Sequence, residues 1–350
     1  MFRWFKKQHD KINSPDLDWI QVEVTTCCNS ACIYCPHTTM GTRLPNKHMP
    51  LDLFNKLIPF IKFTKLIHLQ GWGEPLLNPN IFEMIHICKN NSKYVGLTTN
   101  GTLLNEETIC RVIDSKVDIL GVSLAGATAA SHNKFRQGSD FDKIISNLQL
   151  LYKIKNEKNS QVPALHLAYL MLRSNFHELE KIVLLAKSLG VEQIVASNLS
   201  LIVEPELFAE AIFNNTDLTD SYYRTLEKTK VSAASNDIVF AYNRPDLDDV
   251  SVLCNENVCF ACIVNVDGEV SPCVFTNPVL RTDYRFKNLL LPLKGMSFGN
   301  IQHESLSQIW HKKKYVRFRN LFNPAAIEES GHVLSEMPET CINCYKRLLG

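Results

Sequence analysis

The 350-residue sequence contains no run of about 18 apolar residues that could span a membrane, and residues 1–10 lack the apolar core of a signal peptide. Its formal net charge is only +1, so no overall field attracts nucleic acid or an acidic lipid surface. No fixed-period repeat or low-complexity segment is present. These absences predict a soluble, cytoplasmic protein with no nucleic-acid or membrane partner.

Cysteine, by contrast, is plentiful, with 12 residues. In a sequence of this size without a secretion signal, so many thiols more often serve metal or redox chemistry than a disulfide framework. Their grouping favours the same interpretation, because most fall within residues 27–35 or 254–344. Cys88 and Cys110 stand apart inside helix-like segments and are expected to be small buried hydrophobes.

Strand-like and helix-like segments alternate between the two cysteine groups. Apolar or alternating runs predict strands at 19–24, 65–70, 94–98, 117–124, 164–171 and 192–197. Amphipathic segments predict helices at 51–62, 80–90, 105–115, 141–155 and 176–189. This order predicts an α/β fold with a parallel sheet, curved or closed, whose functional loops lie at the C-terminal ends of the strands.

Composition divides the chain into four parts. Residues 1–17 form a polar, basic N-terminal extension, and residues 18–200 carry the alternating core. Residues 201–250 break the alternation with turn signals and two helix-like pieces, so we expect a linker region there. Residues 251–350 form a small, cysteine-rich α+β unit.

The first cysteine group follows directly after the first predicted strand. Cys28, Cys32 and Cys35 have the spacing C-x3-C-x2-C. Three thiolates at this spacing can hold three irons of a [4Fe–4S] cluster and leave the fourth iron open to a substrate. A zinc knuckle is the alternative for such a motif. Cys27 lies outside the spacing and is interpreted as a packed neighbour.

The run CNSACIYC at 28–35 resembles the cluster-binding motif of the radical S-adenosylmethionine (radical SAM) superfamily, including the aromatic Tyr34 before the last cysteine. Three further segments resemble that family in the expected order: QGWGEP at 70–75, TTNGT at 98–102, and VSLAGAT at 122–128 with FRQG at 135–138. The resemblance implies a partial (β/α)6 barrel, similar to a TIM barrel. It also implies that the open iron binds S-adenosylmethionine and that reduction releases a 5'-deoxyadenosyl radical.

Within this resemblance, the glycine-rich segment forms part of the S-adenosylmethionine site. Gly71, Gly73 and Pro75 belong to the motif, and glycine lets the backbone approach a ligand closely. Glu74 and nearby carbonyls are implied as acceptors for the ammonium of the bound methionine moiety. A simple strand-to-helix turn, which Gly and Pro also favour, is the alternative.

Three further residues complete the implied cofactor site. Asn100 lies in the TTNGT segment, Ser123 is assigned to the ribose, and Arg136 is assigned to the carboxylate of S-adenosylmethionine. Arginine suits that task because its planar fork can pair with both oxygens of a carboxylate. A surface position is the alternative for Arg136. Ala125 stands where many relatives carry Asp, so any role of that Asp is absent.

The second cysteine group contains a hairpin signal. Asp267 and Gly268 lie between two alternating runs, which predicts a two-residue turn. Pairing outward from that turn places Cys262 opposite Cys273, so the two thiols could contribute to one metal site.

The segments VDGEVSPC at 266–273, FGNI at 298–301 and CINC at 341–344 resemble the SPASM/twitch extension of radical SAM enzymes, which binds auxiliary iron–sulfur clusters. The later cysteines that a second auxiliary cluster needs are missing, so one such cluster, expected to be [4Fe–4S], is implied. Its implied ligands are Cys254, Cys273, Cys341 and Cys344, with Cys259 and Cys262 as alternatives for the first. A four-cysteine zinc ribbon is the alternative for the whole unit.

The resemblance therefore implies an enzyme whose radical abstracts hydrogen from a peptide or protein, with a reducing electron from a donor such as flavodoxin or ferredoxin. Alternatives are epimerisation or dehydrogenation of a sugar or other small molecule, metallocofactor maturation, and non-catalytic iron–sulfur binding. The sequence names no residue that quenches the substrate radical. Candidates for the barrel wall, although core packing is expected for each, are His166, Tyr169, Met171 and Asn198.

Overall fold

The computed structural model describes residues 17–91, 93–243, 254–323 and 336–347. The N-terminal extension expected at 1–17 therefore lies almost wholly outside the described residues. Within the described ranges, no helix has both the length and the apolar character needed to span a lipid bilayer.

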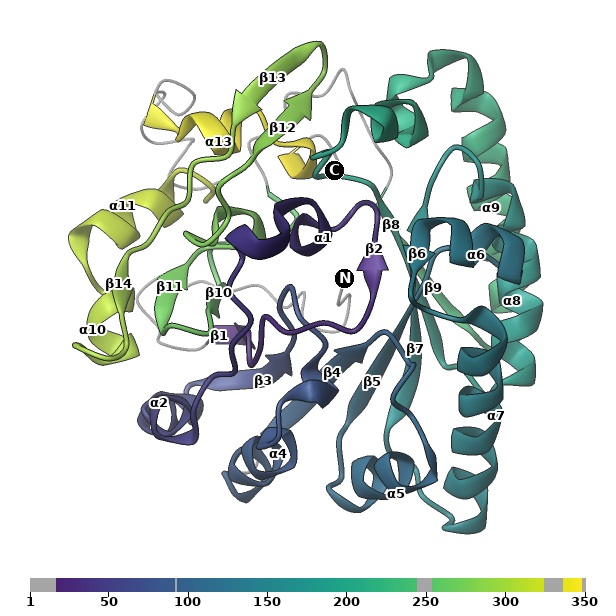
Figure 1. Cartoon of the computed structure of the whole chain (residues 1–350), viewed down its shortest axis with the longest axis horizontal. Helices are drawn as coiled ribbons and strands as arrows, with labels where there is room; N and C mark the ends of the chain where they lie inside the picture. Colours follow the sequence, from purple (N-terminus) through teal and green to yellow (C-terminus); the bar gives the residue numbers. More distant parts are fainter. Residues whose placement is uncertain (1–16, 92, 244–253, 324–335, 348–350) are drawn as a thin grey trace.

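Six parallel strands form the curved centre of the structure, and they confirm the α/β fold that the alternation predicts (Figure 1). They follow one another in chain order, and each pairs in parallel with the next. Each lies close to its predicted range. The strands are β1 (Leu17–Val22), β3 (Thr64–Leu69), β4 (Tyr94–Thr99), β5 (Ile119–Leu124), β7 (Ala164–Met171) and β8 (Gln193–Asn198).

Helices cover the outer face of this sheet, close to their predicted positions (Figure 1). They are α2 (Leu51–Asn55), α3 (Ile58–Ile61), α4 (Ile81–Asn90), α5 (Glu106–Asp114), α7 (Phe141–Glu157), and α8 (Leu179–Ser188) with the 3-10 turn η4 (Phe176–Glu178) before it. The single helix predicted over 51–62 is interrupted between α2 and α3. Pro59 lies in the first turn of α3 and has no backbone N–H, so it cannot continue the preceding helix.

Side chains alternate between the two faces of each strand. On β7, Leu165 and Leu167 pack in the main hydrophobic core under the helices. His166 therefore points to the opposite, inner face of the curved sheet. The same alternation on the neighbouring strands gives an apolar outer face and an inner face that carries polar groups.

Only one of the four candidate wall residues, His166, lies on the inner face. Tyr169 belongs to the outer core, where its hydroxyl donates a hydrogen bond to a backbone carbonyl 3.1 Å away. Met171 lies in the same core. Asn198 also faces outward and accepts a hydrogen bond of 3.0 Å from Tyr222. Tyr169, Met171 and Asn198 therefore pack in the core, which is the outcome that the sequence predicted for each candidate.

The region at 201–250, expected as a linker, extends the sheet in its described part. It contains the 3-10 turns η5 (Pro205–Glu210), η6 (Ile212–Asn214) and η7 (Thr216–Leu218), then α9 (Thr219–Ala234) and β9 (Val239–Tyr242). β9 pairs in parallel with β8, so the region adds a further helix–strand unit. The helix was recognisable from the sequence, but a strand as short as β9 carries too little periodicity to predict.

The C-terminal region joins the opposite edge of the same sheet. β10 (Ala261–Val264) pairs in parallel with β1, and β11 (Glu269–Ser271) runs antiparallel between β10 and β14 (Gly299–Asn300). Among the described strands, β14 and β9 are the two edges of a ten-stranded sheet, so the barrel is open. The other described elements of the C-terminal region are β12 (Asp283–Phe286), β13 (Leu289–Pro292), α10 (Leu306–Trp310), α11 (Lys313–Asn320), α13 (Glu339–Ile342), η8 (Val274–Thr276) and η10 (Tyr345–Arg347).

Several short elements lie in the loops that follow the parallel strands. They are β2 (Ala31–Cys32), α1 (Pro36–Met40), η2 (Gly41–Arg43), η3 (Pro75–Leu77), α6 (Ala129–Phe135) and β6 (Arg136–Gln137). β2 and β6 pair with each other across the mouth of the barrel (Figure 1).

The hairpin between β10 and β11 has a three-residue loop at 266–268 instead of the predicted two-residue turn. Gly268 has a φ of +84°, a conformation that favours glycine. The Gly268 N–H donates to the Asn265 carbonyl at 2.9 Å, and the Asn265 N–H donates to the Glu269 carbonyl at 3.0 Å. This is the pattern of a type I turn followed by a left-handed glycine.

The extra loop residue shifts the register of the hairpin by one position. Ile263 pairs with Ser271, so Cys262 does not lie opposite Cys273. A shift of one residue turns a side chain to the other face of a sheet. The predicted pairing of these two cysteines is therefore wrong, because it assumed the shorter turn.

One buried carboxylate connects the barrel, the glycine-rich motif and the C-terminal region. Glu23 directly follows β1 and is 0% exposed. Its Oε1 accepts a hydrogen bond from the Trp72 N–H at 3.1 Å. Its Oε2 accepts from the Val266 N–H at 3.3 Å and from Asn277 Nδ2 at 3.2 Å. Burial raises the pKa of Glu23, and the hydrogen bonds from these three residues oppose that rise.

We expect Glu23→Gln to lower the free energy of unfolding by about 1–3 kcal/mol, because an amide has one acceptor oxygen and leaves a buried donor unsatisfied. Denaturant unfolding of the metal-free protein measures the change. Glu180→Gln, at an exposed position of α8, is the matched control and should change stability by less than about 0.5 kcal/mol. Equal unfolding midpoints for both variants would contradict this role of Glu23.

Candidate functional site

The three cysteines of the first motif come together in the loop between β1 and α1. Cys32 ends β2, and Cys35 is the residue that precedes α1. Burial raises the pKa of Cys28 and raises the pKa of Cys35 to about 12, and in both cases the nearby Cys32 thiol adds to the rise. The three sulfurs are thus close enough to interact electrostatically. Because thiols bind metal as thiolates, loading this site releases protons.

Arg136 lies beside this motif and is buried, so the surface position considered for it is wrong. The pairing of β2 with β6 sets Arg136 directly across from Cys32. Its Nη1 donates to the Tyr34 hydroxyl, and its Nε has no hydrogen-bond partner among the described residues. Although burial lowers it, the pKa of Arg136 is raised overall by Tyr34 and Cys32. A charged guanidinium with a spare donor fits the predicted pairing with a carboxylate.

Asn100 holds the cysteine loop against the end of β4. Its Nδ2 donates to Asn29 Oδ1 at 2.8 Å and to Ser30 Oγ at 3.0 Å. Asn29 in turn donates from its own Nδ2 to Thr102 Oγ1 at 2.8 Å. The TTNGT segment therefore fixes the position of the loop that carries Cys28 through side-chain hydrogen bonds.

Both oxygens of Glu74 already accept hydrogen bonds from the protein. Oε1 accepts from Thr99 Oγ1 at 2.7 Å and from the Leu76 N–H at 3.2 Å. Oε2 accepts from the Asn100 N–H at 2.7 Å. Burial raises the pKa of Glu74, and these three hydrogen bonds oppose the rise. The carboxylate braces the motif, while its role as an acceptor for an ammonium stays a prediction.

The two motif glycines are required by close packing. A Cβ at Gly73 would lie 2.5 Å from the Thr25 carbonyl oxygen and 2.6 Å from the Cys27 carbonyl oxygen. A Cβ at Gly71 would lie 2.2 Å from the Glu23 side chain. The motif thus packs directly on the cysteine loop, and Pro75 begins the short turn η3 that follows.

The inner face of the strands that lead into these motifs is polar. His68 Nε2 lies 3.0 Å from Gln70 Oε1 and 2.9 Å from Thr98 Oγ1. Its ring packs on the backbone of Gly96, where a Cβ would lie only 2.3 Å from Nδ1. Burial lowers the pKa of His68 to about 4 and also lowers the pKa of His166. Both imidazoles are therefore neutral at pH 7.

Ser123 also lies on the inner face, near the end of β5 and beside Ala168 of β7. It is half-buried. Its assignment to the ribose of S-adenosylmethionine stays a prediction.

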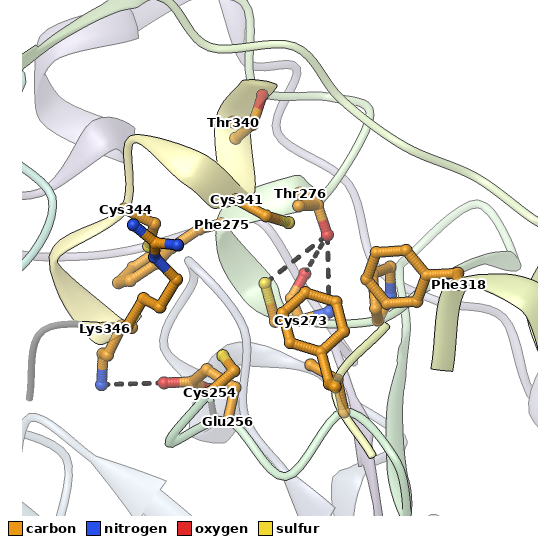
Figure 2. Close-up of a pocket in the computed structure, with 14 residues that line it drawn as sticks. Cys254, Glu256, Cys273, Phe275, Thr276, Phe318, Thr340, Cys341, Cys344 and Lys346 are labelled. Atoms are coloured by element: carbon orange, nitrogen blue, oxygen red, sulfur yellow. Dashed lines mark hydrogen bonds and ion pairs between the residues drawn. The ribbon is translucent and has the colours of Figure 1, made fainter. Parts of the chain in front are cut away.

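A second site is a pocket in the C-terminal region (Figure 2). Burial raises the pKa of all four cysteine thiols that line it, and the Cys273 thiol adds to the rise at the other three. The four cysteines line the same pocket. They belong to the residues that the resemblance implies as ligands: Cys254, Cys273, Cys341 and Cys344.

The two alternative ligands lie elsewhere. Cys259 and Cys262 are absent from the walls of this pocket, and Cys262 shares with Cys273 only a smaller neighbouring cavity. Arg319 lies near both alternative cysteines, and the Cys259 thiol donates to its carbonyl at 3.4 Å. Of the three candidates for the first ligand, Cys254 is the one that the pocket brings to Cys273.

Within the described ranges, no group of three or more Cys, His, Asp or Glu side chains is placed to hold a single metal ion.

Trp72 and Glu23, which the sequence did not identify as site residues, connect the glycine-rich motif to the C-terminal region. Trp72, from the glycine-rich motif, stacks on Phe275 with ring centroids 6.3 Å apart, and Phe275 lines the cysteine pocket. Glu23 binds the backbone of Trp72. Glu23 could have been noticed in the sequence as a charged residue near the end of a predicted strand. No local pattern in the sequence indicates that Trp72 contacts Phe275.

The cysteine motif, its bracing loops and the open parallel barrel define a class of S-adenosylmethionine-dependent iron–sulfur enzymes. A family model of the radical SAM superfamily matches residues 22–186, and the chain belongs to that superfamily, as predicted. A second model, of the SPASM iron–sulfur cluster-binding domain, matches residues 254–345. The chain is thus an enzyme that uses S-adenosylmethionine and a [4Fe–4S] cluster, with an auxiliary iron–sulfur cluster in its SPASM domain.

Two curated relatives match most of the chain. One is a tungsten-containing aldehyde ferredoxin oxidoreductase cofactor-modifying protein of Pyrococcus furiosus, 25% identical over 87% of this chain and 83% of that protein. Another is an AdoMet-dependent heme synthase of Methanosarcina barkeri, 24% identical over 96% of this chain and 92% of that protein.

Solved structures share the fold. SuiB of Streptococcus suis, bound to S-adenosylmethionine, has a TM-score of 0.65 and 13% identity, and the match covers 95% of this chain and 72% of SuiB. AnSMEcpe with bound AdoMet has a TM-score of 0.62 and 18% identity over 87% of this chain and 84% of that chain.

We expect Gly73→Ala to displace the cysteine loop, because its Cβ would overlap backbone oxygens that cannot move away independently. The iron bound after anaerobic reconstitution should fall, and the thermal midpoint should drop by several degrees, as for a loss of about 1–3 kcal/mol.

Gly41→Ala is the matched control, because a Cβ there meets no atom within 4 Å although the backbone has a φ of +51°. It introduces backbone strain without a clash. Full iron loading of Gly73→Ala, equal to that of the control, would refute the packing argument.

Proposed function

We propose that the protein uses a 5'-deoxyadenosyl radical to modify a peptide or protein substrate whose reacting residue enters the barrel. The observation that carries this proposal is the polar but uncharged inner face of the described strands. His68 and His166 are neutral at pH 7, and Thr98 and Gln70 add further hydrogen-bonding groups. Such a wall suits amide groups better than carboxylates or phosphates.

Access to the barrel supports the same proposal. β9 and β14 are the edges of the described sheet and do not pair with each other. An open barrel can admit one residue of a long chain while the rest stays outside. SuiB was solved with its precursor peptide SuiA, and anSMEcpe with the Kp18Cys peptide, so a fold of this kind can hold a peptide.

The chain's own residues prepare the cofactor site in this mechanism. Cys28, Cys32 and Cys35 would hold the core cluster, and Arg136 would hold the carboxylate of S-adenosylmethionine. A reduced cluster at this site would supply the electron that cleaves S-adenosylmethionine, which makes a 5'-deoxyadenosyl radical available to abstract hydrogen from the substrate.

Maturation of a metal cofactor or tetrapyrrole is the second candidate. The two relatives that match most of the chain are named as a cofactor-modifying protein and a heme synthase, which favours this reading. Both substrate classes use the same radical chemistry. They differ in charge, because such cofactors carry carboxylates or phosphates that need cationic partners.

We expect the variant Cys28→Ala/Cys32→Ala/Cys35→Ala to form no 5'-deoxyadenosine above an enzyme-free control, because the core cluster cannot bind. The wild-type protein, reconstituted anaerobically with iron and sulfide and reduced with dithionite, should form it. Cys88→Ala, at a buried position outside both groups, is the control. Product formation by the triple variant would sink the assignment of the core cluster.

Introducing a negatively charged side chain on the inner face of the barrel tests whether the substrate binds there. His166→Glu should abolish the increase in 5'-deoxyadenosine that the substrate causes, while the slow cleavage without substrate continues. His177→Glu, at an exposed position, is the matched control. The assay compares short peptides encoded beside the gene with porphyrins, and mass spectrometry identifies the modified compound. Modification of a porphyrin alone would overturn the peptide proposal in favour of the second candidate.

A further inference from the structure

The cysteine pocket of the C-terminal region also contains two cations, and only one of them is paired. Lys346 Nζ lies 2.8 Å from Glu256 Oε1 (Figure 2). Arg347 is only 8% exposed, and its Nε and Nη1 atoms make no hydrogen bond with any part of the chain that the structure describes. Its backbone N–H donates to the Cys344 carbonyl at 3.1 Å, so the turn η10 fixes its position relative to the cysteines.

An unpartnered guanidinium is unfavourable in a buried pocket, and arginine cannot avoid the cost by losing its proton. None of the other described groups in the walls accepts a hydrogen bond from Nε or Nη1 of Arg347, and the carboxylate among them, Glu256, is paired with Lys346. The hydroxyls of Thr276 and Thr340 donate to the carbonyls of Cys273 and Lys294, and three of the remaining walls are phenylalanine rings. The sulfur atoms of a cluster held by the four cysteines would offer acceptors to these two nitrogens.

We propose that Arg347 donates hydrogen bonds from Nε and Nη1 to sulfur atoms of the auxiliary iron–sulfur cluster and raises its reduction potential. The proposal rests on the predicted ligand set of Cys254, Cys273, Cys341 and Cys344, and it deepens the proposed function. Hydrogen bonds to the sulfurs and the net charge around a cluster both set its potential. One-electron reduction adds one negative charge, which a fixed buried cation stabilises.

Lys346 should have little such effect, although it lines the same pocket. Its ammonium forms an ion pair with the carboxylate of Glu256, so the pair contributes no net charge. Lys346 and Glu256 can be neutralised together without changing the charge of the pocket. This gives a matched control for Arg347, where neutralisation removes one full positive charge.

The test uses the full chain carrying Cys28→Ala/Cys32→Ala/Cys35→Ala, so that the auxiliary cluster is the one measured. After reconstitution with iron and sulfide, the iron content is determined, and EPR-monitored titration with dithionite gives the midpoint potential. Arg347→Gln should keep its iron and show a more negative midpoint. Arg347→Lys should show a smaller shift in the same direction, because the charge stays and the planar fork is lost. Lys346→Gln/Glu256→Gln should stay close to the parent.

An Arg347→Gln midpoint equal to that of the parent would overturn the proposal, and so would an equally large shift in the double variant. If Arg347→Gln loses its iron, Arg347→Lys decides, since a lowered midpoint supports the proposal and an unchanged one overturns it. Full iron binding by a further Cys254→Ala variant also overturns it. These measurements involve neither substrate nor S-adenosylmethionine, so they are independent of the peptide assignment.

Discussion

A buried carboxylate with three donors is the constraint on which the rest of this structure depends. Glu23 can stay buried only while the Trp72 N–H, the Val266 N–H and the Asn277 amide all point at it. Those donors come from the glycine-rich motif and from the SPASM region. The end of β1, the cofactor loop and the C-terminal hairpin are thereby held in one arrangement, and Gly71 is glycine because the Glu23 side chain occupies the space of its Cβ.

The residues of the cofactor site are positioned by the same arrangement. Asn100 and Glu74 use their polar atoms to hold the cysteine loop and the strand ends together before any cofactor is considered. Glu74 accepts three hydrogen bonds from the protein with its two oxygens. Arg136 differs from both, since its Nε has no partner among the described residues. Glu74 and Asn100 therefore find their partners within the protein, whereas Arg136 keeps a donor for the carboxylate that it is predicted to bind.

Much of this could be predicted from the sequence, because the signals were local. The alternation of apolar residues located the six central strands, and the spacing of Cys28, Cys32 and Cys35 identified the core cluster motif. Predictions failed where geometry depended on distant or conformational detail. The loop with its left-handed Gly268 is one residue longer than predicted, which shifts the register of the hairpin by one residue. Cys262 and Cys273 therefore do not lie opposite each other, as the sequence had predicted. The parallel pairing of β10 with β1 joins segments far apart in sequence, which no local pattern reveals.

Stacked aromatic side chains join the glycine-rich motif to the cysteine pocket. Trp72 belongs to the motif, Phe275 lines the pocket, and their ring centroids are 6.3 Å apart. Buried aromatic surroundings have a low dielectric constant, so charge at one cluster would be felt more strongly at the other than it would be through water. Two negatively charged clusters would then oppose each other's reduction unless each had its own nearby cation. Arg136 at the core motif and Arg347 at the auxiliary pocket are the buried cations in those positions.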